Sequence, residues 1–135
     1  MNNNHVFDTN TLVSAVIFPN SVPDKALQKA EREGDLVRSL ATFLELVEVL
    51  QRPKFDKYVS IETRLNFIER YEALFILYPI TYTTTDCRDP KDNKFLELGV
   101  SAKCKIIITG DSDLLVLHPY HGISILKAAE FLFTQ

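Results

Sequence analysis

Five acidic side chains, spread over about a hundred positions, are the groups of this sequence best suited to chemistry: Asp8, Glu45, Asp92, Asp111 and Asp113. Carboxylates that converge repel one another, and burying them without a counter-charge is costly. A hard divalent cation such as Mg²⁺ or Mn²⁺ resolves this repulsion, because it takes oxygen ligands and leaves room for water and phosphate. One or two such ions would activate water for in-line attack on a phosphodiester.

The order of the expected elements brings these acids together. Asp8 follows a short apolar strand, and Asp111 and Asp113 follow the strongest apolar strand of the chain. Glu45 and Asp92 lie near the starts of helices. In a parallel sheet the strand ends and the following helix starts share one edge, which is where function gathers. We therefore expect all five carboxylates at the carboxyl edge of one sheet.

Apolar strands and amphipathic helices alternate along the chain, which predicts an α/β protein with a three-layer α/β/α arrangement. Its central sheet would be parallel and have about five strands. Pro79 places the strand 78–82 at an edge of this sheet. The expected strands are 5–7, 36–39, 78–82, 105–109 and 124–126, and the expected helices are 10–16, 22–33, 41–50, 61–75, 92–102 and 127–133.

The composition predicts one globular domain over residues 1–135 and excludes several classes of protein. Hydrophobic residues make up 46% of the chain, which is enough for a core, and the net charge of −3 argues against binding nucleic acid by bulk charge alone. The two cysteines form no CxxC motif, and the four glycines build no nucleotide-binding loop. No secretory signal or membrane span is apparent, so we expect a cytoplasmic protein without a membrane partner.

Four segments of the sequence together resemble the motifs of the PIN domain family of metal-dependent ribonucleases. They are Val6–Ser14 (VFDTNTLVS), Thr42–Leu50 (TFLELVEVL) with Arg52–Phe55 (RPKF), Asp89–Leu96 (DPKDNKFL) and Ile107–Leu115 (IITGDSDLL). Each motif alone is weak, but their order and spacing cover nearly the whole chain. Within the family, the stand-alone toxin-like proteins of prokaryotic toxin–antitoxin operons are the most similar group.

This resemblance implies a role for each matching residue. Asp8, Glu45, Asp92 and Asp111 match the metal-binding acids of the family, and Asp113 matches an auxiliary acid. Two polar residues, Asn10 and Thr109, match those that orient the acids or the water. The implied activity is Mg²⁺- or Mn²⁺-dependent endonucleolytic cleavage of single-stranded RNA that leaves 3′-hydroxyl and 5′-phosphate ends. The implied partners are an RNA substrate, an antitoxin protein and a second copy of the chain, for which the helices 22–33 and 61–75 are candidate interfaces.

Every acid also has a structural alternative. Asp8 could close a turn, Asp92 could cap its helix, and Asp111 could be a turn residue after Gly110. Glu45 completes the pattern Thr42-x-x-Glu of a capping box, which would give it a purely local role. Glu48 lies one turn from Glu45, and the family match favours Glu45 as the site acid.

Basic and aromatic residues follow the Glu45 helix. Arg52, Lys54 and Lys57 could contact RNA phosphates, with a solvated surface as the alternative. Tyr58 and Tyr82 could stack on bases, but we expect them to pack in the core or at its rim.

Two other functions compete with the nuclease. A haloacid-dehalogenase-type phosphatase shares the pattern around Asp8, but its second acid is replaced by Asn10, which cannot transfer a proton. A PIN fold that serves only as an interaction module is the non-enzymatic alternative. Missing acids would favour it, and none of the matched acids is missing.

Overall fold

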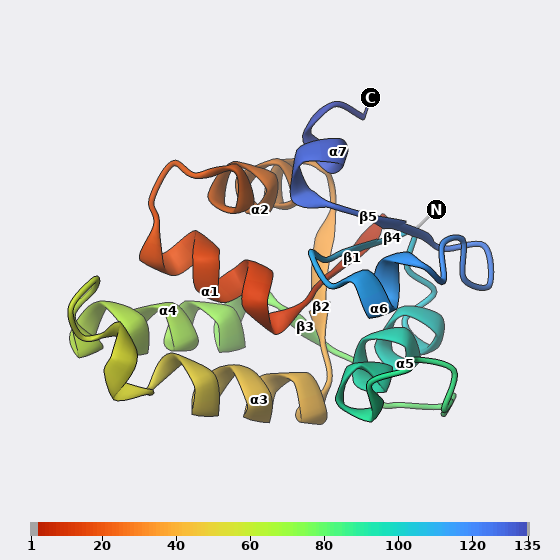
Figure 1. Ribbon diagram of the computed structural model, residues 1–135, viewed down its shortest axis with the longest axis horizontal. Coiled ribbons are helices and arrows are strands. Elements are labelled where there is room, and N and C mark those ends of the chain that lie inside the picture. Colours follow the sequence, from red (N-terminus) through yellow and green to blue (C-terminus); the bar gives the residue numbers. More distant parts are fainter. Residues whose placement is uncertain (1–2, 135) are drawn as a thin grey trace.

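A parallel five-stranded sheet forms the centre of the protein (Figure 1). The computed structural model describes residues 3–134. All neighbouring strands pair in parallel, in the order β3-β2-β1-β4-β5, so the first strand of the chain is the central one. The strands are β1 (Asn4–Phe7), β2 (Asp35–Arg38), β3 (Ile76–Leu77), β4 (Ile106–Ile108) and β5 (Ser124–Leu126).

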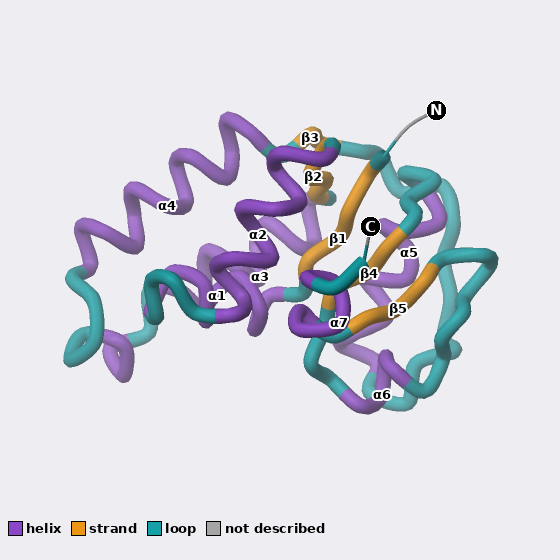
Figure 2. The backbone as a smooth tube through the Cα atoms, turned by 90° about the horizontal axis from the view of Figure 1, so that it is seen from above, coloured by secondary structure: helices purple, strands orange, loops and turns teal. Residues whose placement is uncertain are grey.

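Helices cover both faces of this sheet, which confirms the expected three-layer α/β/α architecture (Figure 2). Five helices pack into the core on one face: α1 (Thr9–Ile17), α2 (Val22–Glu33), α3 (Leu40–Leu50), α4 (Ile61–Leu74) and α7 (Ala128–Leu132). Two cover the other face: α5 (Asn93–Ser101) and α6 (Ser112–Leu115). Two short 3-10 turns, η1 (Pro53–Phe55) and η2 (Pro90–Asp92), precede α4 and α5.

Successive side chains of a strand point to opposite faces of the sheet, so they pack alternately into these two cores. Phe7 and Ile108 pack with α1, α2 and α3, whereas Val6 and Ile107 pack with α5 and α6. Because both faces are apolar, the strands read as continuous hydrophobic runs. The polar residues that follow them are therefore left at the strand ends.

The expected strand at 78–82 is wrong, because the edge strand β3 comprises only Ile76 and Leu77. The Tyr78 N–H still donates to the Arg38 carbonyl at 2.9 Å, but Pro79 has no N–H to continue the ladder. The Thr81 N–H then turns to the Ser101 hydroxyl at the end of α5, at 2.9 Å. The chain therefore leaves the sheet and crosses toward α5.

The helix ends agree with the expected ones to within about two residues, and three short elements, η1, η2 and α6, were not expected. Each of the three is four residues or shorter, too short to show a helical period. Within residues 3–134, no helix combines the length and the apolar composition needed to cross a bilayer.

Candidate active site

Four of the five predicted acids line one cavity of about 250 Å³ at the carboxyl edge of the sheet. We call it the acid cavity. Asp8 comes from the end of β1, Glu45 from α3, Asp92 from the start of α5 and Asp111 from the turn after β4. Its full lining is Asp8, Thr9, Asn10, Glu45, Val49, Arg52, Asp89, Lys91, Asp92, Phe95 and Asp111. Topology thus brings together residues that are up to 103 positions apart (111 − 8 = 103).

Asp8 ends the central strand and begins α1. One of its oxygens accepts a 2.8 Å hydrogen bond from the Thr11 N–H, and the other accepts one from the Thr109 hydroxyl. The residue is only 4% exposed. Burial raises the pKa of Asp8 above its ordinary value, and the Asp111 carboxylate adds to the rise. A cation beside this carboxylate would offset the cost of keeping it ionised.

Glu45 does not form the capping box that its spacing predicts. Ser39 is the N-cap of α3, and it exchanges hydrogen bonds of 3.2 and 2.9 Å with Thr42. The Glu45 carboxylate is therefore available to the cavity, where one oxygen accepts the Thr9 hydroxyl and the other lies 2.7 Å from Lys94 Nζ. Glu48 is paired at 2.8 Å with Arg52 and is largely exposed, and it does not line the cavity.

Asp92 carries the least satisfied oxygen of the site. Its Oδ2 is buried and has no hydrogen-bond partner in the described part of the chain. Burial raises the pKa of Asp92 to about 7, and Asp111, Asp89 and Asp8 add to the rise. An orphaned buried oxygen among carboxylates has the chemistry that a hard divalent cation would satisfy. The residues present therefore fit the ion that the sequence implies.

Asp111 and Asp113 differ in their placement. Asp111 lines the acid cavity, and its Oδ1 accepts the Asp113 N–H at 2.8 Å. The Asp113 carboxylate instead lies 3.4 Å from Arg88 Nε and is not part of the cavity wall. Thr109 is fully buried, donates to Asp8 and accepts the Asp111 N–H at 3.0 Å. It is thus placed to fix two of the acids, as its position in the motif implies.

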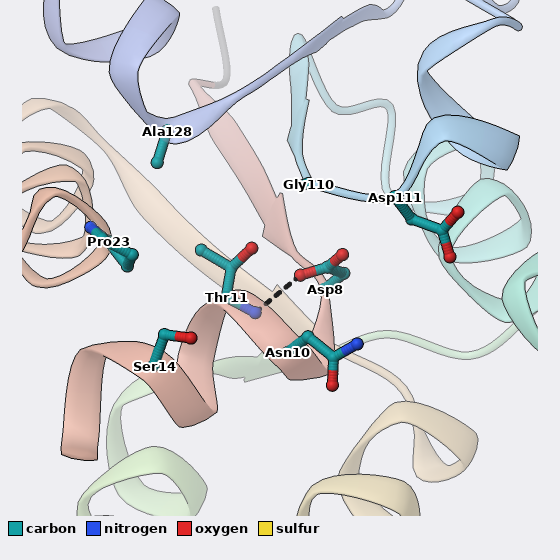
Figure 3. Close-up of a pocket in the computed structure, with 8 residues that line it drawn as sticks. All are labelled: Asp8, Asn10, Thr11, Ser14, Pro23, Gly110, Asp111 and Ala128. Carbon is teal, nitrogen blue, oxygen red and sulfur yellow. Dashed lines mark hydrogen bonds between the residues drawn. The ribbon is translucent and has the colours of Figure 1, made fainter. Parts of the chain in front are cut away.

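Asn10 is exposed at the boundary between the acid cavity and a second cavity of about 350 Å³. Figure 3 shows the residues that line this second cavity: Asp8 accepts the hydrogen bond from Thr11, and Asp111 lies on the opposite side of Asp8 from Thr11. Asp8, Asn10 and Asp111 line both cavities. A polar substrate could therefore reach the acids from either side.

Among residues 3–134, no three acidic, histidine or cysteine side chains already stand close enough to share one ion. The contacts of each acid explain this spacing. Glu45 is drawn toward Lys94, and Asp8 is held by Thr109 and Thr11.

The comparisons with known proteins bear on this geometry. The sequence model of the PIN domain matches residues 4–113, which include all five acids. The chain belongs to the PIN domain family. The chain is also similar to a protein of Methanocaldococcus jannaschii, the uncharacterized protein MJ1680. The two are 34% identical over 114 residues, which is 83% of this chain and 73% of that protein.

A solved structure supports the fold of this PIN domain. The crystal structure of PAE2754 from Pyrobaculum aerophilum superposes with a TM-score of 0.61 and covers 97% of this chain and 88% of that one. At 15% identity, this likeness concerns the fold alone. PIN domains are typically nucleases that use divalent metal ions, so the family agrees with an acidic site at the sheet edge.

Sequence reasoning missed several residues of the site. Thr9 and Lys94 both contact Glu45, and Lys91 lines the acid cavity. Asp89 accepts the Lys91 N–H at 3.1 Å and also lines the cavity. Lys94 lies inside the third motif, Asp89–Leu96, and this position could have indicated that it is near the site. Its contact with a residue 49 positions away depends on the tertiary fold.

Proposed function

We propose that this PIN domain is a divalent-metal-dependent endoribonuclease that cleaves single-stranded RNA. The observation that carries the proposal is the buried, unpartnered Oδ2 of Asp92 in a cavity walled by further carboxylates. Asp8, Glu45, Asp92 and Asp111 would hold Mg²⁺ or Mn²⁺. When bound, such an ion supplies Lewis-acid stabilisation of a phosphodiester and lowers the pKa of water.

Polar residues around the cavity would orient these acids and the substrate. Thr109 holds the Asp8 carboxylate, and Thr9 holds Glu45. Asn10 stands exposed at the mouth, where its amide can position RNA or water. Asp113 is proposed as an auxiliary acid. Its backbone N–H donates to the Asp111 carboxylate and holds it in place, and its own carboxylate is paired with Arg88.

Positive charge at the cavity wall supports a phosphate-bearing substrate. Arg52 and Lys91 line the acid cavity beside the carboxylates. A bare cluster of acids would repel the backbone of RNA, whereas basic side chains on the wall can contact its phosphates. The cavity therefore combines groups for a metal ion with groups for a phosphodiester.

A matched pair of glutamates tests the assignment. Glu45→Gln removes a cavity carboxylate, whereas Glu48→Gln changes an exposed one a single turn away. With Mn²⁺ and a total RNA pool, we expect Glu45→Gln to lose cleavage and Glu48→Gln to retain it. Equal cleavage by both variants would overturn the assignment. Mn²⁺ binding without cleavage, or no binding at all, would favour an interaction module, and a stable phospho-aspartate at Asp8 would favour a phosphatase.

The proposed biological setting is that of a cytoplasmic toxin, with an antitoxin that inserts a segment into the acid cavity. We also propose a homodimer. Three exposed apolar side chains of α4, Ile61, Leu65 and Leu74, support that helix as a dimer surface. Light scattering of the wild type and Leu65→Glu tests this point, since a change from dimer to monomer supports the interface and an unchanged mass argues against it.

A further inference from the structure

Two exposed aromatic side chains lie outside both cores, one at the end of α1 and the other in the turn that follows η1. Phe18 and Tyr58 are 52% and 54% exposed, and their rings meet edge to face with centroids 5.9 Å apart. Lys57 adds a positive charge, because its Nζ lies 5.2 Å from the centroid of the Tyr58 ring. Of the two places that the sequence predicts for Tyr58, the core and its rim, this exposure excludes the core.

The turn that carries Tyr58 is held rigidly from beneath. Arg64 is fully buried and donates to the Leu50 carbonyl at 2.7 Å and to the Arg52 carbonyl at 3.2 Å, and it pairs with Asp56. Backbone hydrogen bonds close the turn itself, including one of 3.0 Å from the Tyr58 N–H to the Phe55 carbonyl. The exposed ring is thus presented from a fixed backbone, so its ordering costs little when it binds a flat ligand.

The acid cavity leads toward this aromatic pair. Glu45 and Val49 lie one turn apart on α3, Arg52 follows two residues after the end of that helix, and all three line the cavity. Arg52 then begins the turn that ends at Tyr58. On the other side, α1 starts beside Asp8 and ends before Phe18, roughly 15 Å away at the rise of an α-helix. Figure 1 shows that α1 and α3 both run away from the sheet toward this end of the molecule.

The charge of the turn complements a polyanion. Residues 52–58 contain three bases, Arg52, Lys54 and Lys57, and one acid, Asp56, which is already paired with Arg64. Arg52 is paired with Glu48, but that pair is solvent-exposed and is therefore weak enough to exchange for a phosphate. Exposed aromatic rings set among basic side chains are the combination that binds single-stranded nucleic acid without reading its sequence.

We propose that Phe18 and Tyr58 form a base-stacking platform for single-stranded nucleic acid, with Arg52 and Lys57 on its phosphates. The platform lies at the end of the path along α3 and holds the strand whose neighbouring phosphodiester enters the acid cavity. That last step rests on the proposed nuclease function, but binding at the platform needs neither metal nor cleavage. The two can therefore be tested separately.

The test is the affinity of the full chain for a short fluorescein-labelled oligouridylate, measured by fluorescence anisotropy in EDTA so that no cleavage occurs. We expect the double variant Phe18→Ala, Tyr58→Ala to bind about tenfold more weakly or worse, since each stacked base contributes about 1–3 kcal/mol. Tyr58→Trp keeps a stacking surface and should bind like the wild type. Phe133→Ala removes a still more exposed ring elsewhere, at 87% exposure, and should have no effect.

The salt dependence separates the basic residues from the rings. Lys57→Ala should weaken binding and lower the slope of log K against log salt by about 0.7, as expected for one phosphate contact on a single strand. The double aromatic variant should weaken binding with the slope unchanged. Full affinity in the double variant overturns the platform, and so does a wild type that fails to bind the oligouridylate.

A protein contact is the remaining alternative for these rings. If light scattering shows a different oligomeric state for the double variant while its affinity for the oligouridylate is unchanged, the rings belong to a protein interface and the platform is overturned. Failure of the nuclease proposal has a different signature. It would appear as cleavage that is absent, or that Glu45→Gln leaves intact, whatever the anisotropy shows.

Discussion

Lys94 Nζ lies 2.7 Å from Glu45 Oε2, so a side chain of α5 places a positive charge against one of the proposed metal ligands. Both groups are mostly buried, with 18% and 26% of their side chains exposed. A divalent ion that used Glu45 would compete with this ammonium group. The lysine thus balances the charge of the cavity when no ion is bound.

Removing this competitor should strengthen metal binding. We expect Lys94→Met to bind Mn²⁺ several-fold more tightly than the wild type in calorimetry, because Glu45 is then free and a repelling charge is gone. Lys94→Arg keeps the charge and should bind Mn²⁺ like the wild type. Weaker or unchanged binding by Lys94→Met would show that the lysine does not compete with the ion.

Asp92 should make the stability of the metal-free protein depend on pH. Folding raises the pKa of Asp92 from 3.8 to about 7, so its proton is bound more tightly in the folded state. This stabilisation is complete below the pKa of the unfolded state, and it is lost as the pH rises from there through the pKa of the folded state. In EDTA, the Tm of the wild type should therefore fall relative to that of Asp92→Asn between about pH 4 and pH 8. A constant difference in Tm over this range would rule out the raised pKa.

Thr109 should matter for both stability and activity. Thr109→Val removes the hydroxyl that donates to the buried Asp8 carboxylate and accepts the Asp111 N–H. Leaving a buried acceptor unsatisfied costs about 1–3 kcal/mol, which urea unfolding can measure. Thr109→Ser retains the hydroxyl and should recover most of the stability and the cleavage rate. If the valine variant is as stable as the wild type, the hydrogen bond to Asp8 contributes nothing.

Arg64 should be one of the most sensitive positions outside the site. Arg64→Met removes the donor to the Leu50 carbonyl, at a cost of about 1–3 kcal/mol while that carbonyl stays buried, whereas the Arg52 carbonyl keeps the Phe55 N–H as a donor at 3.1 Å. The free energy of unfolding in guanidinium chloride should fall accordingly. Arg70→Met, on the exposed side of α4, is the matched control and should change this free energy little. An equal decrease in the free energy of unfolding for the two variants would show that Arg64 does not stabilise the turn.

Sequence patterns predicted the layered fold well, because its signals are local. Short apolar strands such as 105–109 and the helix starts near Glu45 and Asp92 are visible as runs and caps, and parallel topology then fixes their common edge. The prediction of an edge strand at 78–82 was wrong for a reason that lies outside that segment. Pro79 was visible, but the Ser101 hydroxyl that takes the following Thr81 N–H belongs to α5 and could not be read from the segment itself.

The candidate site was predictable in its acids and not in their partners. The four cavity acids lie in motifs, and a strand end or helix start places each of them. Lys94, Thr9 and the buried state of Asp92 Oδ2 depend on side-chain packing between α1, α3 and α5. The local sequence could not decide whether Glu45 caps its helix. The pair Ser39 and Thr42 and the pair Thr42 and Glu45 both have the spacing of a capping box, and the structure uses the first pair.

The rate of Mn²⁺-dependent cleavage of a labelled single-stranded RNA, compared between the wild type and Asp92→Asn purified in parallel, tests the nuclease most directly. We predict cleavage by the wild type that EDTA abolishes and that leaves 5′-phosphate and 3′-hydroxyl ends. Asp92→Asn should be slower by about a hundredfold or more, which corresponds to losing a few kcal/mol of transition-state stabilisation. Equal rates for the two proteins, or cleavage that persists in EDTA, would contradict a metal-dependent site at Asp92.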